Sequence, residues 1–505
     1  MPDTIPDLLD EAAADAPSRV WLRTDDRAYT FSEAHGLVGR ASAALAATGV
    51  GHGDRVLLTA RNTPEYLFAW LATASLGAIV VAVNPKAGDH ELVGLIRQVT
   101  PKLVVTDPEA PTAARDGDVP AIDAAALYAE PAGDTPLPRP RPDDPAVLIP
   151  TSGTTGRSKL VTQTHRAYVM AGEGFPWWME LGPDDRLMTS LPLFHINAPA
   201  YSVLGSIAAR AGLVLLPRFS AGTFLDSARR HGATEFNAIG AMLEILMRQP
   251  EREDDAETPL RLCYTGPTPP KARQLEIEAR FGLRIVCGYA LSESPYGMIW
   301  PRGERPFGTL GTVRQHPRLG TVSEARVMRD GLEQAEGEAG ELELRSPAVM
   351  RGYWDMPEET AEVLGPDGWL RTGDLVRRDA DGTYTFIGRV KEVIRRRGEN
   401  VAPAEIEEAL CAHPDVTEAA VIGVPSELTE EEIKAFVAVA DPAAADLGAI
   451  RDAAAAQLTP FKVPRYVEAV SELPHTPTGR VAKHRLPRER TAAEMDFDTR
   501  VGSAG

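Results

Sequence analysis

Cysteine is scarce in this sequence, which contains only Cys263, Cys287 and Cys411. The three residues are scattered among apolar neighbours and lack the close spacing of metal ligands. They predict packed thiols in a reducing cytoplasm, and they argue against a disulfide framework or a cysteine metal centre.

The sequence also lacks a long hydrophobic run and an excess of basic residues. Its longest apolar runs, such as residues 76–83, are far too short to span a bilayer. No basic segment followed by an apolar one opens the chain, so we expect no membrane span, no export and a cytoplasmic location. The net charge of −19 argues against nucleic acid as a partner. An acidic protein that binds an anionic ligand needs cations gathered at the binding site. The three arginines at 395–397 are a candidate for such a cluster, and the alternative is that they form a solvated basic face.

The length and the residue pattern predict an α/β protein of at least two domains. A chain of 505 residues exceeds what one hydrophobic core usually serves, and 43% hydrophobic with 25% charged residues is typical of a soluble globular protein. Strand-like runs alternate with amphipathic helical stretches, as at Arg55–Ala60, Pro64–Ala74 and the strand near Ile79. This alternation favours mostly parallel sheets. The Pro-rich and charged residues 131–144 predict a surface connection.

The pattern changes after Gly388. Four shorter segments predict a compact α+β unit: a helix near Ala404–Ala412, strands at Val416–Val424 and Ile433–Val439, and a helix near Leu447–Leu458. We therefore predict an N-terminal domain at 1–388, a C-terminal domain at 391–490 and a loose tail at 491–505.

The most informative segment is residues 150–165, PTSGTTGRSKLVTQTH. It follows the apolar run Ala146–Ile149, which predicts a buried strand. Small residues with two glycines offer backbone amides and hydroxyls to a polyphosphate, and Lys159 adds a cation. It is not a Walker A loop, because Leu160 stands where Ser or Thr belongs. An ordinary surface loop is the alternative for this composition alone.

Further motifs follow in order along the chain. They are Tyr289–Glu293 (YALSE), Gly352–Trp354 with Pro357–Thr360, Gly368–Asp374 (GWLRTGD), Gly388–Glu392 (GRVKE) and Gly398–Glu407 (GENVAPAEIE). With the 150–165 segment they resemble the signatures of the adenylate-forming superfamily, which includes acyl-CoA synthetases, peptide-synthetase adenylation domains and luciferases. Within this superfamily, the motifs most resemble those of crotonobetaine/carnitine-CoA ligase-like members and of aryl- or fatty-acid-CoA ligases. The resemblance covers Tyr29 to Lys483.

The resemblance implies a large N-terminal domain with mostly parallel sheets flanked by helices, and a small mobile α+β C-terminal domain. It implies ATP-dependent activation of a small acid as an acyl-adenylate, release of pyrophosphate and transfer to CoA. It also implies Mg²⁺ on Glu293, a hard oxygen ligand. The chemistry joins two anions, so cations and a fixed nucleotide are needed.

The resemblance assigns a part of the ATP molecule to most residues of the implied nucleotide site. Lys159 and the loop would hold the β- and γ-phosphates, Ser292 the α-phosphate, Tyr289 the adenine and Asp374 the ribose, with Arg389 at the sugar or phosphate. The implied ATP-binding residues are Thr151, Ser152, Gly153, Thr154, Thr155, Gly156, Gly266, Pro267, Gly288, Tyr289, Ala290, Leu291, Ser292, Asp374, Phe386, Arg389 and Arg395.

The implied acid site and hinge come from the same resemblance. His195, in PLFHIN, would border the carboxylate, with a satisfied core histidine as the alternative. The implied acid-binding residues are His195, Asn197, Asn237, Gly240, Ala241, Met242 and Tyr296. Lys391 marks the hinge, and the CoA path would include Arg397, Gly398 and Glu399. Gly398 would let the backbone line a narrow passage.

One residue departs from the family pattern. The C-terminal element TPTGR carries Arg480 where family members usually have the catalytic lysine. Arginine is forked and bulkier, so the exchange is not conservative. This departure leaves three explanations. Arg480 takes over the role of the missing lysine, Lys483 takes it over instead, or the enzyme activates an unusual acid. A small planar oxyacid would suit the two parallel donors of a guanidinium. Three alternatives therefore stay open: a diazotase that activates nitrite for an arylamine, a carrier-protein-loading enzyme, and an inactive nucleotide sensor. The oligomeric state is open between monomer and homodimer.

Overall fold

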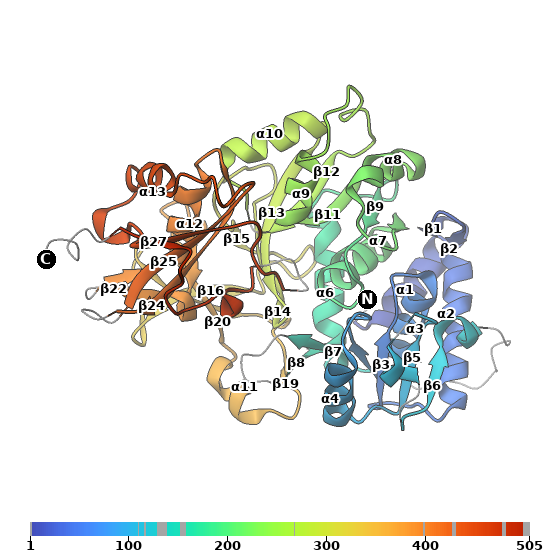
Figure 1. Cartoon of the computed structure of the whole chain (residues 1–505). Helices are drawn as coiled ribbons and strands as arrows, with labels where there is room; N and C mark the ends of the chain where they lie inside the picture. Colours follow the sequence, from blue (N-terminus) through green and yellow to red (C-terminus); the bar gives the residue numbers. More distant parts are fainter. Residues whose placement is uncertain are drawn as a thin grey trace, which may run out of the picture. The chain divides into compact units, whose positions relative to one another are not determined.

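The computed structural model describes residues 3–109, 111–115, 118–128, 139–151, 158–266, 268–396, 399–426, 431–476 and 481–497. The chain divides into two compact units (Figure 1), a larger one of Met1–Ala325 with Glu343–Thr372 and a smaller one of Arg326–Leu342 with Gly373–Gly505. It passes from one unit to the other at 325/326, 342/343 and 372/373, each time within a strand. The smaller unit includes residues 326–342 and 373–388, which the sequence assigned to the N-terminal domain; the hinge position stays a prediction.

The larger unit contains a sheet whose central strands are parallel. Its strand order is β15 (Thr312–Val313), β14 (Ser294–Ile299), β13 (Arg284–Leu291), β12 (Leu262–Gly266), β11 (Glu235–Ile239), β9 (Arg186–Thr189), β10 (Gly212–Leu215), β1 (Val20–Arg23), β2 (Ala28–Thr30). The pairs from β13 through β1 are parallel, and the outer pairs are antiparallel. This sheet confirms the α/β class.

A further sheet of the larger unit also has a parallel centre. Its order is β19 (Gly352–Tyr353), β8 (Lys159–Thr164), β7 (Pro145–Thr151), β4 (Ile79–Ala82), β3 (Arg55–Thr59), β5 (Leu103–Thr106), β6 (Ala121–Asp123). Strands β4, β3, β5, β6 and β7 pair in parallel, whereas β8 runs antiparallel to β7 and β19. β3, β4 and β7 are mostly buried apolar runs, which is why the sequence revealed them.

The helices of the larger unit begin at recognisable caps. Thr30 and Thr63 each accept a hydrogen bond from the first turn of α2 and α3, and Pro64 occupies the first position of α3. Gly232 and Gly282, with φ of 62° and 65°, end α8 and α10. The helices are α1 (Ile5–Asp15), α2 (Phe31–Ala47), α3 (Pro64–Ser75), α4 (Asp89–Val99), α5 (Thr112–Arg115), η1 (Ala124–Tyr128), α6 (His165–Trp178), the π-helix η2 (Ala198–Val203), α7 (Leu204–Ala209), α8 (Ala221–His231), α9 (Gly240–Met247), α10 (Lys271–Phe281) and α11 (Pro357–Val363). Among the described residues, no helix has the length and hydropathy needed to cross a membrane.

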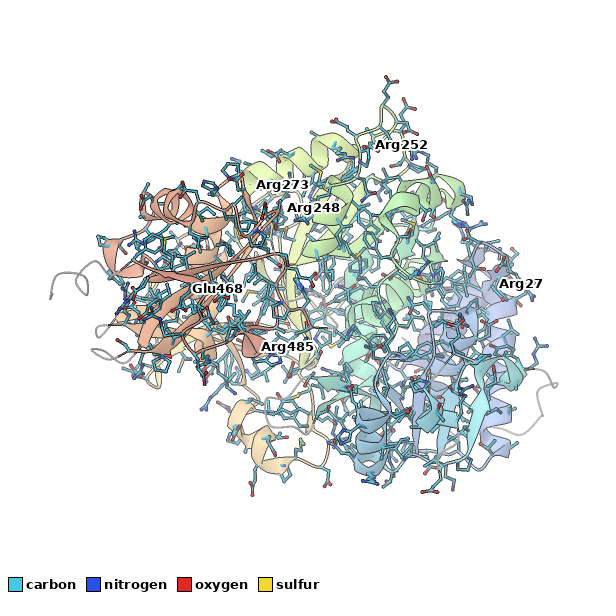
Figure 2. All side chains as sticks on the ribbon, viewed as in Figure 1. Arg27, Arg248, Arg252, Arg273, Glu468 and Arg485 are labelled. Carbon is cyan, nitrogen blue, oxygen red and sulfur yellow. The ribbon has the colours of Figure 1, made fainter. Side chains whose placement is uncertain are left out.

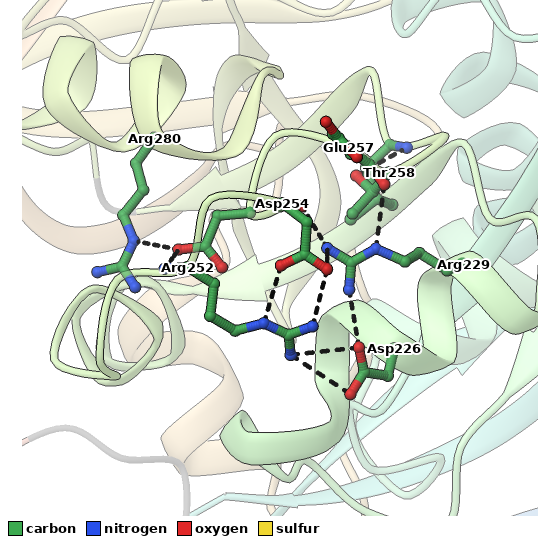
Figure 3. A network of polar contacts seen from close by, with 9 residues as sticks. Asp226, Arg229, Arg252, Asp254, Glu257, Thr258 and Arg280 are labelled. Carbon is green, nitrogen blue, oxygen red and sulfur yellow. Dashed lines mark hydrogen bonds and ion pairs between the residues drawn. The ribbon is translucent and has the colours of Figure 1, made fainter.

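The connection between α9 and β12 is held by ion pairs (Figure 3). Arg229 of α8 lies 2.7 Å from Asp226 and 3.2 Å from Asp254 of the connection. Arg280 of α10 pairs with the buried Asp255 at 2.8 Å. Exposed pairs of this kind contribute little singly, but the Arg280–Asp255 pair is shielded from water. The network fixes where the chain enters β12.

The smaller unit is built from short sheets. One has the order β17 (Leu332–Glu333), β16 (Glu324–Arg329), β18 (Ala339–Arg345), β20 (Leu370–Arg378), β21 (Tyr384–Arg389), and parts of β16, β18 and β20 belong to the larger unit. A hairpin pairs β22 (Ile394–Arg396) with β23 (Glu399–Val401). The remaining sheet runs β24 (Val416–Pro425), β25 (Glu431–Val439), β26 (Tyr466–Val470), β27 (Glu494–Asp496). The helices are η3 (Val390–Glu392), α12 (Pro403–Cys411), α13 (Leu447–Ala455), η4 (Pro460–Lys462) and η5 (Lys483–Arg485).

Two features of this unit correct the sequence predictions. Residues 494–496 are not a loose tail: β27 pairs with β26, and Glu494 lies 2.7 Å from the buried Lys434, which also meets Glu468 (labelled in Figure 2) at 3.1 Å. Cys411 is exposed, whereas Cys263 and Cys287 are buried as expected. Residues 498–505 of the predicted tail lie outside the described residues.

Candidate active site

Four parallel strands of the larger unit end at one edge of their sheet. The register aligns Asn237 with Tyr264 and Ile239 with Gly266, and β9 ends beside β11 (Figure 1). The segments that leave this edge are those carrying His195, Gly240–Met242, Gly266 and the end of β13. Ligand sites of parallel sheets lie at the carboxyl ends of the strands. The edge therefore brings the predicted acid-binding and adenine-binding segments together.

The end of β13 forms a tight turn into β14. Tyr289, Ala290, Leu291, Ser292 and Glu293 are all half-buried, between buried residues on both sides. A side chain on Gly266 would lie 2.5 Å from the carbonyl oxygen of Gly288, so β12 and β13 approach closely there. The turn thus exposes the predicted nucleotide residues on a rigid base.

A buried arginine, Arg314, supports the strands that carry this turn. Arg314 is fully buried; its guanidinium donates to the Pro295 and Met298 carbonyl oxygens at 3.0 and 3.1 Å and to the Tyr201 hydroxyl at 2.9 Å. It also donates to the Tyr264 hydroxyl. These bonds tie β14 to β12 and η2, and no carboxylate of the described residues lies within 4.0 Å of the cation. No pattern in the sequence predicts this role for Arg314.

Two strands of the second sheet flank the predicted phosphate segment. Thr151 ends β7 and pairs with Lys159 at the start of β8, and the Thr151 hydroxyl donates to the Lys159 carbonyl oxygen at 3.2 Å. The connecting residues Ser152, Gly153, Thr154, Thr155 and Gly156 lie outside the described residues, as does Pro267. The described strands on either side of these residues, β7 and β8, are antiparallel neighbours, whereas in a P-loop a strand is followed by a helix.

Lys159 and Glu293 meet the same tyrosine. The Lys159 ammonium lies 4.7 Å from the centre of the Tyr353 ring, and the Tyr353 hydroxyl donates to Glu293 Oε1 at 3.0 Å. Gln163 of β8 donates to the Ser292 carbonyl oxygen at 2.6 Å, and the Met350 amide donates to the Glu293 carbonyl oxygen at 2.8 Å. Tyr353 and Gln163 were not among the predicted site residues, although the GYW element containing Tyr353 was one of the family motifs.

The predicted acid-binding residues are partly connected. The Asn237 amide donates to Asn197 Oδ1 at 2.7 Å, and Asn237 Oδ1 is buried without a hydrogen-bond partner in the described chain. His195 is half-buried, with its ring 4.5 Å from that of Phe194. Tyr296 is buried, and its ring lies 5.0 Å from that of Trp178. Gly240 and Met242 open α9, with Ala241 exposed between them.

The predicted ribose residues lie in the smaller unit. Asp374 of β20 and Arg389 of β21 face each other, with Arg389 Nε 2.6 Å from Asp374 Oδ1. Asp374 is 1% exposed and Arg389 36%, so only the arginine has a solvent-facing surface. Phe386 of the same strand is also exposed.

The arginine run at 395–397 is not a uniform basic face. Arg395 is exposed, but Arg396 is 7% exposed and pairs with Glu432 at 2.5 Å. Arg396 also donates to the carbonyl oxygens of Phe461 and Val463. Arg396 is therefore a structural residue. Arg397 and Gly398 lie outside the described residues, as does the side chain of Glu399.

Lys483, the alternative to Arg480, is already paired. Its ammonium lies 2.7 Å from Glu392 and 2.8 Å from Glu407. Burial raises the pKa of Glu407, while the two carboxylates together raise the pKa of Lys483 despite its burial. Lys391, the predicted hinge residue, is exposed and precedes Glu392 in η3. Arg480 lies outside the described residues.

Comparison with known proteins decides the family. The AMP-binding enzyme family matches residues 9–354, and the AMP-binding enzyme C-terminal domain matches residues 405–480. The chain belongs to the AMP-binding enzyme family. The resemblance read from the motifs is confirmed.

Relatives match this AMP-binding enzyme over nearly its whole length. Sulfoacetate–CoA ligase from Cupriavidus necator is 34% identical, covering 96% of this chain and 97% of its own. Crotonobetaine/carnitine–CoA ligase from Salmonella agona is 30% identical, covering 91% and 93%. The structure of O-succinylbenzoate CoA synthetase from Bacillus subtilis with ATP and magnesium ion is 27% identical, with a TM-score of 0.85, covering 95% and 98%.

Proposed function

We propose that this AMP-binding enzyme activates a small acid with ATP and transfers the acyl group to CoA. A carboxylate oxygen attacks the α-phosphorus of ATP, pyrophosphate leaves, and the CoA thiol then displaces AMP from the acyl-adenylate. The observation that carries the proposal is the joining of Lys159 and Glu293 through Tyr353, beside the strand ends that carry Tyr289 and Ser292. It places a cation and a carboxylate beside the predicted nucleotide residues.

Each residue has a role that follows from its chemistry. Lys159 neutralises phosphate charge, since no described carboxylate lies within 4.0 Å of its ammonium. Tyr289 stacks on adenine, Asp374 accepts from the ribose hydroxyls, and Arg480 compensates charge at the α-phosphate. His195 and Asn237 border the acid.

The residues present fit a magnesium ion. Among the described residues, no cation lies within 4.0 Å of the Glu293 carboxylate, which accepts a hydrogen bond from the Tyr353 hydroxyl. No cluster of three or more His, Cys, Asp or Glu side chains forms a metal cage in the described chain. Mg²⁺ often takes one or two carboxylates plus phosphate oxygens, and bound there it would offset the charge of the phosphates.

Pyrophosphate release measured with a panel of acids tests the proposal. The panel contains short acids with a second anionic group, sulfoacetate included, with aryl and fatty acids beside them. Two further assays test the alternatives, which the CoA-ligase relatives do not favour. Nitrite supplied with an arylamine tests the diazotase, and a phosphopantetheinyl carrier protein tests the carrier-loading enzyme. CoA-dependent thioester formation with one acid supports the proposal. Release with none would favour an inactive nucleotide sensor. The cytoplasmic location remains a prediction.

A further inference from the structure

Tyr353 contacts two nucleotide motifs that are far apart in the sequence. It lies on β19, an edge strand in which Gly352 pairs with Thr162 and Tyr353 with Val161 of β8. Its ring meets the ammonium of Lys159, and its hydroxyl meets the carboxylate of Glu293. Tyr353 is 9% exposed, whereas Lys159 and Glu293 are half-buried.

The position of Tyr353 is fixed by its neighbours. Its amide donates to Thr360 Oγ1 at 2.9 Å. Gly352 has a φ of 134°, and a side chain there would lie 2.7 Å from Thr360 Cγ2, so glycine is required before the tyrosine. α11, which carries Thr360, therefore holds the ring in place.

Tyr353 contacts two groups of opposite charge, the Lys159 ammonium and the Glu293 carboxylate. In the described chain, Lys159 and Glu293 form no ion pair within 4.0 Å of each other. A direct ion pair would offset both charges, because opposite charges in contact attract each other. The aromatic ring stabilises the ammonium by a cation–π contact, while the hydroxyl binds the carboxylate. The tyrosine thus satisfies each group without cancelling either charge.

We propose that Tyr353 is a positioning residue that keeps Glu293 directed to a divalent cation and Lys159 directed to the nucleotide phosphates. This inference rests on the proposed function, which assigns those two ligands. Tyr353 acts through its neighbours and needs no contact with the nucleotide.

Binding of α,β-methylene-ATP, measured by calorimetry with and without Mg²⁺, tests the proposal without turnover. Tyr353→Phe keeps the ring on Lys159 but removes the donor to Glu293. We expect the gain in affinity from Mg²⁺ to fall about tenfold, as for loss of a hydrogen bond to a charged group, with Mg²⁺-free binding unchanged. Tyr353→Leu should weaken Mg²⁺-free binding as well. Tyr66→Phe is the matched control, because the Tyr66 hydroxyl is buried without a hydrogen-bond partner in the described chain.

Glu293→Gln separates this inference from the proposed function. If Glu293→Gln leaves the Mg²⁺ gain intact, the metal assignment itself fails. If it removes the gain while Tyr353→Phe keeps the parental value, the positioning role is wrong. The double variant should match Glu293→Gln alone, since the hydroxyl acts through that carboxylate. Additive losses, or equal losses with and without Mg²⁺, would indicate a merely structural residue and overturn the inference. Tyr353→Trp, which keeps a ring without the hydroxyl, replaces Tyr353→Phe if the latter does not fold.

Discussion

Asp374 and Arg389 face each other across β20 and β21, with Arg389 Nε 2.6 Å from Asp374 Oδ1. The half-exposed guanidinium orients the buried carboxylate. The predicted role of Asp374 is to accept hydrogen bonds from the two ribose hydroxyls.

Asp374→Ala should weaken ATP binding by about 1–3 kcal/mol, because the ribose hydroxyls lose their acceptor. Calorimetric titration with ATP measures this loss. Asp415→Ala, which removes an exposed carboxylate of the same unit, is the control and should bind ATP like the parent. Unchanged ATP binding by Asp374→Ala would remove the ribose assignment.

Lys391→Pro should spare adenylation and suppress thioester formation. Proline fixes φ at a position predicted to rotate between the two half-reactions. Pyrophosphate release and CoA thioester formation are measured separately. Lys391→Ala removes the exposed side chain but leaves the backbone free, so it should retain both steps. A parallel fall of both steps in the proline variant contradicts the hinge assignment.

Arg480→Ala should lower the adenylation rate by orders of magnitude, since a charge at a developing oxyanion is worth about 3–4 kcal/mol. Arg480→Lys tests the acid. Lysine should serve nearly as well or better for an ordinary carboxylate, and clearly worse for nitrite or another small planar anion. Full activity of Arg480→Ala would refute the catalytic role of Arg480.

Lys483→Ala should chiefly destabilise the smaller unit, because Glu392 and Glu407 lose their shared cation. We expect a loss of about 1–3 kcal/mol in the free energy of unfolding, with partial exposure limiting the effect. Denaturant titration measures it, and Lys462→Ala, which breaks a more exposed pair with Glu405, is the comparison. If Lys483→Ala instead abolishes adenylation at unchanged stability, the catalytic cation is Lys483.

His165 should make the protein less stable in acid. Burial lowers the pKa of His165 to about 4 from 6.5. The unfolded chain therefore binds more protons than the folded one between these values, and the free energy of unfolding falls as pH drops through that window, by about 3 kcal/mol in full. Denaturant titrations from pH 7 to 4 should show a shallower fall for His165→Asn, which keeps an acceptor for the Ile5 amide. His90→Asn, at an exposed position, should leave the slope unchanged; an unchanged slope in His165→Asn would contradict the assignment.

Elements with strong local patterns were predictable from the sequence. The buried run of β3, the proline start of α3 and the apolar strands β24 and β25 appear where their residues predict them. The nucleotide motifs were also found, because the family repeats them at familiar separations. In both cases the signal lies within a short window.

The remaining features depend on partners distant in the chain. The two-residue strand β19 exists because β8 offers it an edge, and β27 forms where β26 offers an edge and Lys434 meets Glu494. Arg396 is buried because Glu432 and the Phe461 carbonyl oxygen accept its donors, whereas its neighbours in the sequence indicate a basic surface. Long-range contacts of this kind leave no local periodicity.

The chain crosses between the two units three times, and this sets the order in which their parts are synthesised. Residues 326–342 leave the ribosome before 343–372, so the larger unit is still incomplete when the first part of the smaller one has been made. The edge of β8 stays unpaired until β19 is synthesised, and Tyr353 is made after both Lys159 and Glu293. A nascent chain stalled before residue 352 should therefore hold an open strand edge beside its phosphate segment, which is a place for chaperones to bind.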